Sequence, residues 1–474
     1  MLNTELDETL KNKKKYNQFF TNKYISQKMS ESIKFLDDQI DTIKILDPGS
    51  GFGNLGIEAI NYIYLNFTKI KKIEIDLYEI DSILIGRLKA NFVKLQKRMK
   101  INSIILDFNI YNEDFLLSDS STMYDLIIMN PPYKKINQKT CYSLKLKEVG
   151  VNTVNTYTSF IKKALINLDK NGIAIFITPR SFMNGKYHIK FREWLFSKFC
   201  LNKIVWFKSR SLFDGVLQEV VISVFQKKIQ SDFINLEYID DETLNETSLR
   251  VNQQLVIDKD NMVRFFSNNI DIYTYQKERN LKRIEELGIN VSTGPVVYFR
   301  QSKNYLRKKN TLNAYPYIFS EHVGNGMVTN WPKKNPKRYN YLLKKDDNKK
   351  VFRKNDAYVL VKRVTSKEDS KRIYASILSK FDKYDMVALD NSINFFYFKN
   401  PNVNKINILK GLCVYLNSSF VDNIFRQFSG NTQVNIYDLK VLRYPTLKQL
   451  SNMSSGFNRS QSEIDLCVKK YLED

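Results

Sequence analysis

The feature that most constrains this chain is the sequence Asn130-Pro131-Pro132-Tyr133, which directly follows the largely apolar run 124–129. Such a run is typical of a buried strand in a parallel sheet. Two consecutive prolines exclude a helix and a paired central strand, so the strand ends here in a rigid turn. Asn130 is therefore presented at the carboxyl end of a strand, the edge of an open α/β sheet where ligands bind.

This turn has the chemistry to hold a planar amino group. The side-chain oxygen of Asn130 and the main-chain carbonyl of Pro131 can accept both hydrogens of one NH₂, and Tyr133 offers a flat face for stacking. Two such acceptors favour a pyramidal nitrogen whose lone pair faces the donor of a transferred group. The alternative is an ordinary Asn-Pro turn without a functional role, so other parts of the chain must decide between a structural turn and a binding site.

Size and composition bound the class of protein. With 474 residues, 43% of them hydrophobic, the chain has room for two domains and cannot be disordered. No apolar stretch approaches the length of a membrane span, and the basic run 11–15 is not followed by an apolar segment. The scattered cysteines have neither metal nor disulfide spacing: Cys141, Cys200, Cys413 and Cys467. We expect a cytoplasmic protein without a metal site.

The net charge of +24 favours a polyanionic partner. It arises from 74 Lys and Arg against 50 Asp and Glu, and each phosphate that such residues neutralise releases counterions. Part of the excess is compositional drift, because the chain is rich in Lys, Asn, Ile and Tyr. The charge therefore supports a nucleic-acid partner without establishing one.

The first half of the chain alternates apolar strands with amphipathic helices, the pattern of a parallel sheet wound with helices. The expected strands are Lys44–Asp47, Ile73–Tyr78, Ser103–Leu106, Asp125–Met129, Ile173–Thr178, Lys203–Phe207 and Val220–Phe225, the last two antiparallel. The expected helices are Tyr24–Asp37, Leu55–Leu65, Ser82–Met99, Tyr157–Leu168 and His188–Phe199. Residues 230–290 are polar and indicate few strands, with a helical run over Asp271–Leu287. We place a domain boundary at 240/241, giving domains 1–240 and 241–474.

A glycine-rich turn follows the first strand. Asp47, Gly49 and Gly51 stand in an acid-Pro-x-x-Gly-x-Gly order before a helix, where glycines let the backbone approach a ligand closely. The order differs from the G-x-G-x-x-G fingerprint of dinucleotide sites. An acid before the glycines suits a ligand with a cationic amine better than a pyrophosphate.

Two further strands end in side chains that fit a nucleoside. Glu79, after the second strand, can accept both hydroxyls of a ribose. Asp114 and Phe115, after the third, offer an acceptor for an adenine amino group and a ring for its face. Each acid alone is more often a surface residue or helix cap. Amine, ribose and adenine sites in this order together describe S-adenosylmethionine.

At this point the chain resembles the gamma-class DNA adenine-N6 methyltransferases of restriction–modification systems, of the BsuBI/PstI kind. The resemblance rests on segments 17–29, 172–182, 212–221 and 429–440, with Tyr444-Pro445 completing the last. It implies that Thr21 helps to hold the methionine carboxylate, and that Phe213 stacks on a flipped base opposite Tyr133. Asn22 departs from the proline usual in the first motif. From its position alone, the favoured interpretation of Phe213 is a core aromatic residue beside a hairpin.

The family resemblance implies a fold and a function. We expect a Rossmann-like, doubly wound α/β domain that binds S-adenosylmethionine, followed by an α+β target-recognition domain. The implied reaction is transfer of the methyl group to N6 of an adenine in a short double-stranded DNA sequence, with the base flipped out, so that host DNA is protected. A monomer suffices for a palindromic site, and a separate cognate endonuclease, not stably bound, is expected to perform cleavage.

The second half offers basic residues for DNA contacts. Arg353, Lys362 and Arg363 lie among aromatic residues, a mixture able to combine phosphate and base-edge contacts. For any one of them, a solvated basic face is the simpler interpretation. Two other functions also remain open: methylation of an RNA adenine or a protein glutamine amide, which likewise uses Asn-Pro-Pro-Tyr, and a non-catalytic DNA-binding subunit.

Overall fold

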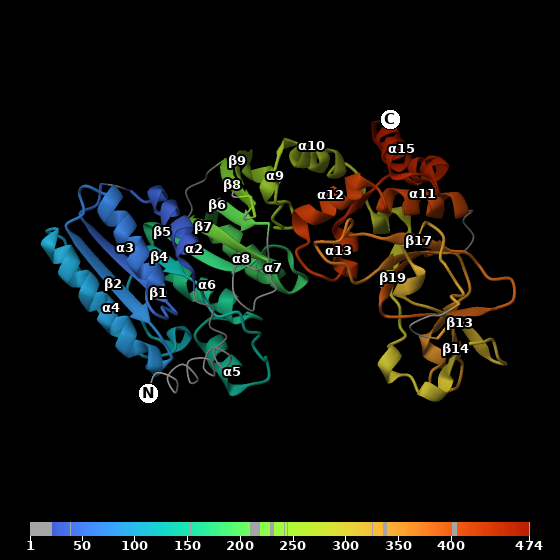
Figure 1. The fold of residues 1–474 in the computed structure, drawn as a ribbon, viewed down its shortest axis with the longest axis horizontal. Helices are drawn as coiled ribbons and strands as arrows, with labels where there is room; N and C mark the ends of the chain where they lie inside the picture. The colour runs from blue at the N-terminus through green and yellow to red at the C-terminus, as the bar shows by residue number, and fades with distance from the viewer. Residues whose placement is uncertain are drawn as a thin grey trace. The chain divides into compact units, whose positions relative to one another are not determined.

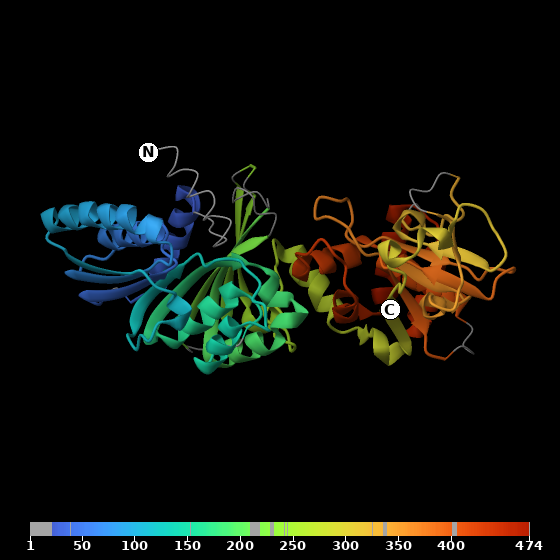
Figure 2. The same ribbon diagram turned by 90° about the horizontal axis from the view of Figure 1, so that it is seen from below.

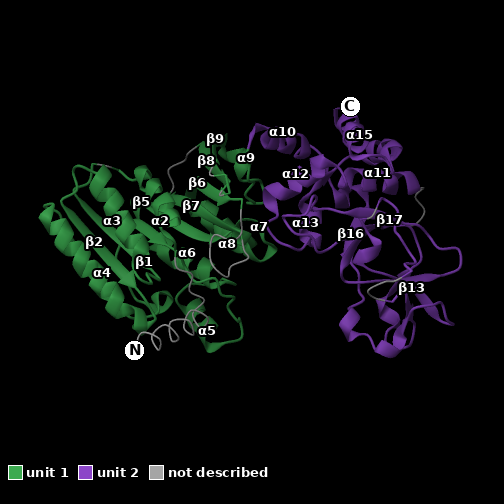
Figure 3. Ribbon diagram, in the orientation of Figure 1, with its two compact units in different colours: residues 1–267 green, residues 268–474 purple. Residues whose placement is uncertain are grey.

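The computed structural model describes residues 21–37, 39–151, 153–208, 219–227, 232–240, 242–243, 245–324, 326–334, 339–400 and 405–473. The chain divides into two compact units, Met1–Ser267 and Asn268–Asp474 (Figure 3). Among the described residues, no helix is both long and apolar enough to cross a membrane.

Unit 1 is built on one large sheet. Within the described residues it has nine strands in the order β3-β2-β1-β4-β5-β7-β6-β8-β9 (Figure 1). Their bounds are β1 Thr42–Pro48, β2 Lys72–Tyr78, β3 Ile105–Tyr111, β4 Tyr124–Met129, β5 Leu168–Pro179, β6 Phe199–Phe207, β7 Val220–Lys227, β8 Phe233–Asp240 and β9 Asn245–Asn252. Strands β1 to β5 run parallel, and β7 runs antiparallel to both β5 and β6. This is the doubly wound α/β class expected from the sequence, and the predicted antiparallel pair is confirmed.

Helices cover both faces of this sheet (Figure 2). The helices of unit 1 are α2 Lys23–Ser30, α3 Asn54–Asn66, α4 Ser82–Ile101, α5 Cys141–Glu148, α6 Thr156–Ile166, α7 Ser181–Asn184, α8 Ile189–Lys198 and α9 Gln253–Val256. Apolar residues of α2, α3 and α4 pack with alternate residues of β1, β2 and β4 into one buried core. The alternate apolar residues of the strands and the apolar faces of the helices are therefore buried in the same cluster.

Several expectations about element bounds are wrong. The expected helix Tyr24–Asp37 is α2 followed by a 3₁₀ turn, Glu31–Phe35, and Leu168 begins β5 instead of ending a helix. The third strand starts at Ile105 rather than Ser103, because α4 continues to Ile101 and Ser103 lies in the left-handed region with φ 60°. The helical run over Asp271–Leu287 is instead α10 (Asn269–Glu278), a two-residue strand β10 (Lys282–Arg283) and a 3₁₀ turn, Ile284–Leu287. β10 pairs with β20 (Arg443–Tyr444), a partner that lies far along the chain.

The boundary between the units also differs from the expected 240/241. Residues 230–252 are not strand-poor, because β8 and β9 extend the sheet of unit 1 through eight antiparallel residue pairs. Seven of the eight residues of β9 are exposed or half-buried. An edge strand that buries almost nothing carries no hydrophobic pattern, so the sequence did not reveal it.

Unit 2 is an α+β unit whose described residues form two larger sheets besides the short β10–β20 pair. One sheet has the order β11-β19-β16-β17 and the other β12-β14-β13-β18-β15. Their bounds are β11 Ile289–Thr293, β12 Leu306–Arg307, β13 Ala314–Ile318, β14 Tyr341–Leu343, β15 Phe352–Lys354, β16 Tyr358–Lys362, β17 Ala375–Leu378, β18 Met386–Leu389 and β19 Ile393–Phe398. The helices after them are α11 Ile406–Leu416, α12 Ser419–Phe428, α13 Ile436–Val441, α14 Leu447–Met453 and α15 Gln461–Glu473.

Candidate functional site

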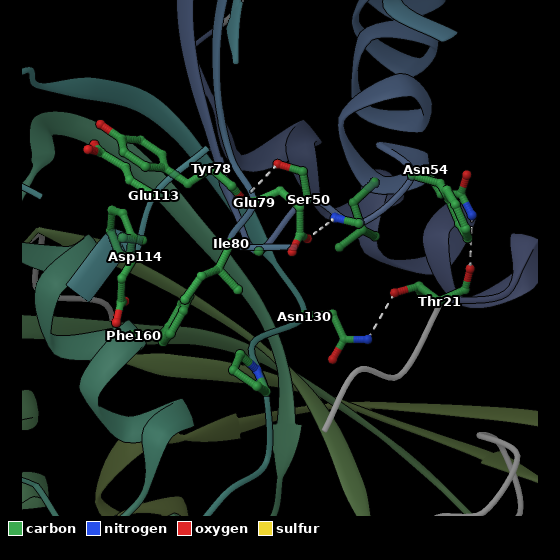
Figure 4. Close-up of a pocket in the computed structure, with 16 residues that line it drawn as sticks. Thr21, Ser50, Asn54, Tyr78, Glu79, Ile80, Glu113, Asp114, Asn130 and Phe160 are labelled. Carbon is green, nitrogen blue, oxygen red and sulfur yellow. Dashed lines mark hydrogen bonds between the residues drawn. The ribbon is translucent and has the colours of Figure 1, made fainter. Parts of the chain in front are cut away.

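The carboxyl ends of four adjacent parallel strands, β3, β2, β1 and β4, meet at one pocket (Figure 4). Its empty space amounts to about 760 Å³ when the open solvent at its mouth is included. The lining residues are Thr21, Gly49, Ser50, Gly51, Phe52, Asn54, Leu55, Tyr78, Glu79, Ile80, Glu113, Asp114, Phe115, Asn130, Pro132 and Phe160. The structure therefore brings most of the sequence-predicted cofactor residues together with the Asn-Pro-Pro-Tyr turn.

The glycine loop after β1 forms one wall of the pocket. Gly49, Gly51 and Gly53 have φ of 82°, 57° and 82°, in the region that side chains rarely adopt. Gly53 is also the residue before α3, and a Cβ added there would lie 2.6 Å from Phe92 and 2.7 Å from Leu88. The loop thus needs glycine for its turns and for its close approach to α4.

Glu79, at the end of β2, holds this loop. One carboxylate oxygen accepts from the main-chain N–H of Gly51 at 2.9 Å and the other from that of Asp81 at 2.8 Å. Burial raises the pKa of Glu79, although both of these hydrogen bonds oppose the rise. A carboxylate oxygen has more than one acceptor direction, so Glu79 can also accept from ligand hydroxyls.

Asp47 lies under the loop rather than on the pocket wall. It is 1% exposed, and its Oδ2 accepts from the N–H of Gly56 in α3 at 3.2 Å. Its Oδ1 is buried and has no hydrogen-bond partner among the described residues. Burial raises the pKa of Asp47 to about 7, against the effect of the Gly56 hydrogen bond, and nearby Glu79 adds to the rise. Asp47 therefore fixes the loop to α3, a different place from the amine contact we expected.

Asp114 and Phe115 stand where β3 ends. Asp114 accepts from the N–H of Leu116 at 3.0 Å and from the hydroxyl of Tyr142 at 2.8 Å. The ring of Phe115 meets those of Tyr78 and Phe160, with centroids 5.2 Å and 5.5 Å away. An acid and an apolar ring surface thus lie side by side, as a nucleobase requires.

Half of the sixteen lining residues were not predicted from the sequence, Ile80 and Phe160 among them. Ile80 is 47% exposed although it is a large apolar residue, and it follows Glu79 directly on the pocket wall. Phe160, from α6, is brought to the pocket from more than forty positions along the chain from Phe115. An apolar residue directly after a strand-end acid was a usable signal for Ile80, whereas nothing local marks Phe160.

The side chain of Asn130 has a defined orientation. Its Nδ2 donates to Thr21 Oγ1 at 3.0 Å (Figure 4), and its Oδ1 accepts from the Tyr133 hydroxyl at 2.9 Å. That hydroxyl also lies 3.2 Å from the carbonyl oxygen of Ile177 in β5. Burial raises the pKa of Tyr133, which keeps the hydroxyl a donor. The amide oxygen is therefore kept as the acceptor, and the nitrogen faces Thr21.

The two prolines of the turn differ in exposure. Pro131 is buried and Pro132 is half-buried, and Pro132 lines the pocket. Tyr133 packs edge-on against Tyr157 of α6, with ring centroids 6.2 Å apart. The turn is thus supported on its inner side by packing and presents its outer side to the pocket.

The remaining predicted contact residues are scattered. Phe213 lies outside the described residues. Arg353 is on β15 and donates to the carbonyl oxygens of Lys350 and Phe352, both at 3.1 Å. Lys362 and Arg363 are instead at the end of β16, in the other sheet of unit 2. The structure does not place Arg353 in one cluster with these two residues.

Within the described residues, no group of three or more His, Cys, Asp or Glu side chains could hold a metal ion. Burial lowers the pKa of both His188 and His322 to about 4. Both imidazoles are therefore neutral near pH 7. Neither one lines the pocket.

Comparison with known proteins gives relatives over the whole chain. Residues 3–213 match the model of the Eco57I restriction-modification methylase family. The type II methyltransferase M.PstI of Providencia stuartii is 33% identical over 99% of this chain and 95% of its own length. M.BsuBI of Bacillus subtilis is 32% identical over 98% of this chain and 95% of its own length.

A solved structure shares the fold over nearly the whole chain. The type IIL restriction-modification enzyme MmeI, solved in complex with DNA, aligns with a TM-score of 0.56 at 13% identity. The alignment covers 99% of this chain and 73% of that one. At this level of identity, the likeness concerns the fold alone.

Proposed function

Because this chain belongs to the family of type II restriction–modification methyltransferases, like M.PstI and M.BsuBI, we propose that it transfers a methyl group from S-adenosylmethionine to DNA. The acceptor is the N6 amino group of an adenine in a short double-stranded sequence. The adenine is flipped out of the duplex, because its amino group cannot reach a pocket while the base is stacked.

The lining residues fit the parts of the donor. Glu79 offers acceptors for the ribose hydroxyls, while Asp114 accepts from the adenine amino group. Ile80, Phe115 and Phe160 provide apolar surface for its ring. Thr21 and the glycine loop remain for the methionine end. When bound, the donor supplies a methyl group on a positively charged sulfur.

The orientation of the Asn130 amide is the main observation that supports this proposal. The hydrogen bond from Nδ2 to Thr21 leaves Oδ1 as an acceptor, and the Pro131 carbonyl provides the second one. The acceptor amino group would donate one hydrogen to each, which fixes its nitrogen and turns its lone pair toward the methyl group. Positioning and preorganised dipoles then lower the barrier, so no covalent intermediate with the protein is required.

Tyr133 would provide the face on which the flipped base stacks. Its hydroxyl is held by Asn130 and Ile177, so the ring orientation is set before any substrate arrives. Base–aromatic stacking is worth about 1–3 kcal/mol, which offsets part of the few kcal/mol needed to unstack the base. We assign Phe213 to the opposite face of that base.

We further propose that unit 2 recognises the DNA sequence and that the chain acts as a monomer in the cytoplasm. The net charge of +24 supports a polyanionic partner. A separate endonuclease would cut unmodified DNA. Sedimentation of the purified protein, alone and with a DNA duplex, tests the monomer.

The deciding experiment incubates the protein with labelled S-adenosylmethionine and an unmethylated plasmid library, and then maps N6-methyladenine by sequencing. We expect methylation confined to one short motif, and none with Asn130→Ala although that variant still binds S-adenosylmethionine in calorimetry. Labelling of RNA or of a protein extract instead of DNA would reassign the substrate. No transfer to any acceptor would leave a non-catalytic DNA-binding subunit.

A further inference from the structure

Two segments of unit 2 that are distant in sequence form one edge. Residues 363–365 follow β16, and residues 431–433 join α12 to α13 (Figure 1). The N–H of Thr365 donates to the carbonyl of Thr432 at 3.0 Å, and that of Val434 to the carbonyl of Arg363 at 2.8 Å. Val364 and Gln433 form an antiparallel bridge between them. We call these six residues, 363–365 and 431–433, the paired edge.

A buried arginine holds both segments from within. Arg372 is 0% exposed. Its guanidinium donates to the carbonyl of Ser429 at 3.2 Å, to that of Asn431, and to the hydroxyl of Thr365 at 3.4 Å. One side chain therefore fastens the backbone of one segment to a side chain of the other.

A second arginine holds the loop between β16 and β17. Arg426, on α12, donates to the carbonyls of Lys367 at 2.7 Å and Asp369 at 2.8 Å. Asp422, one turn earlier on α12, accepts from Arg426 Nε at 2.8 Å and from the N–H of Arg372 at 2.6 Å. The paired edge is thus preorganised, so little conformational entropy is lost when it binds a partner.

Four side chains of the paired edge are exposed, three polar and one apolar. Asn431, Thr432 and Gln433 are exposed, and Val364 is 61% exposed. The side chains of Asn431, Thr432 and Gln433 make no hydrogen bond to any described residue. The amides of Asn431 and Gln433 and the hydroxyl of Thr432 can pair with the donors and acceptors of base edges. The methyl groups of Val364, on the other segment, can contact the methyl group of thymine.

Positive charge stands beside the paired edge. Lys362 ends β16 directly before it, and its ammonium lies 4.8 Å from the centre of the Tyr374 ring. Arg363 donates to the carbonyl of Asn391 at 3.1 Å through one of its terminal nitrogens. Cations next to unpaired amides are the combination in which phosphate contacts set the position and amides read the sequence.

We propose that the paired edge reads base pairs of duplex DNA in the major groove, with Gln433 and Asn431 as the reading side chains. The amide of Gln or Asn pairs in two places with adenine, at N6 and N7, so each is expected to specify an A·T pair. Lys362 and Arg363 contact phosphates beside it. This inference rests on the proposed function, because it presumes that DNA is the substrate.

The test maps the methylated motif of Gln433→Ala and Asn431→Ala in the plasmid-library experiment. Each variant should lose discrimination at one motif position by roughly 10- to 100-fold, because binding to the original motif weakens while binding to motifs with another base there does not. Its S-adenosylmethionine affinity should stay within a few-fold. Gln433→Glu, which can accept from cytosine N4 but cannot donate to adenine N7, should disfavour adenine at the same position. Asn171→Ala, an exposed amide at the amino end of β5, is the matched control.

The outcomes separate the two proposals. If the unaltered protein methylates no DNA, the proposed function fails. If it methylates one motif and all three variants keep that motif unchanged, the base-reading inference is overturned and the function stands. A uniform loss of binding over all sequences, with the preferred motif unchanged, would show phosphate contact only and also overturns it.

Discussion

At the scale of single residues, hydrogen bonds decide what each polar group is able to do. The amide of Asn130 has an oxygen and a nitrogen of nearly equal size, and only their partners distinguish them. Thr21 Oγ1 accepts from the nitrogen, which makes Thr21 a positioning residue for Asn130 as well as a lining residue of the pocket.

We therefore predict that Thr21→Val lowers kcat about tenfold, since one hydrogen bond worth roughly 1–1.5 kcal/mol no longer orients the amide. Thr21→Ser, which keeps the hydroxyl, should restore most of the rate. Methyl-transfer kinetics and calorimetry of S-adenosylmethionine provide the measurement. A loss confined to cofactor affinity, with kcat unchanged, would show that Thr21 serves the cofactor alone.

Asp47 gives a prediction about pH. Its folded pKa of about 7 lies above the ordinary value of 3.8, so its contribution to stability is full below pH 4 and is lost as the pH rises through 7. Replacement by asparagine removes this proton linkage. From pH 5 to pH 8, the unfolding free energy of the unaltered protein should fall by roughly 2–3 kcal/mol relative to Asp47→Asn. Parallel pH profiles in thermal unfolding would refute the assignment.

At the scale of elements, the pocket depends on how strands end and helices begin. The glycine loop passes so close to α4 that the Phe92 and Leu88 side chains leave no room for a Cβ on Gly53. The loop, α3 and α4 therefore act as one packed unit, and the ligand-facing backbone is rigid because its back is filled.

Two glycines separate this effect from ordinary helix propensity. Gly53→Ala should destabilise the protein by more than about 3 kcal/mol. Backbone strain at φ 82° contributes roughly 1–3 kcal/mol, and steric overlap with the neighbouring side chains adds a similar amount. Gly86→Ala, on α4 with open space around it, should stabilise by roughly 0.5–1 kcal/mol. Denaturant unfolding measures both changes. Equal effects of the two substitutions would contradict the packing argument.

At the scale of the whole molecule, the sheet of unit 1 sets where the chain divides. Strand β9 pairs with β8 along its full length, and a cut at residue 240 would remove it. The edge of β8 would then be unpaired, which favours association with another edge.

We predict that a fragment of residues 1–267 is monomeric and binds S-adenosylmethionine, whereas residues 1–240 aggregate. Size-exclusion chromatography and calorimetry on both fragments check this. A stable, monomeric 1–240 fragment would show that β9 is dispensable and that the earlier boundary was adequate.

The core of unit 1 and the turn at its edge could be predicted from local sequence patterns. The central strands are apolar runs between turn residues, and two prolines permit only one kind of strand ending, so β1, β2, β4, β5 and the Asn130 turn followed from local rules. The acids and glycines at the strand ends were readable because parallel strands bring their carboxyl ends to one edge.

The direction in which these groups face, and the residues that contact them, became known from the folded chain alone. Asp47 lies under the loop rather than in the pocket, Phe160 arrives from a distant helix, and β9 pairs without a hydrophobic pattern. Arg372 donates to carbonyl groups 57 and 59 positions away along the chain, those of Ser429 and Asn431, and also to the hydroxyl of Thr365 in its own loop. Such contacts depend on packing between remote parts of the chain, and a periodic local pattern records burial but not the partner that causes it.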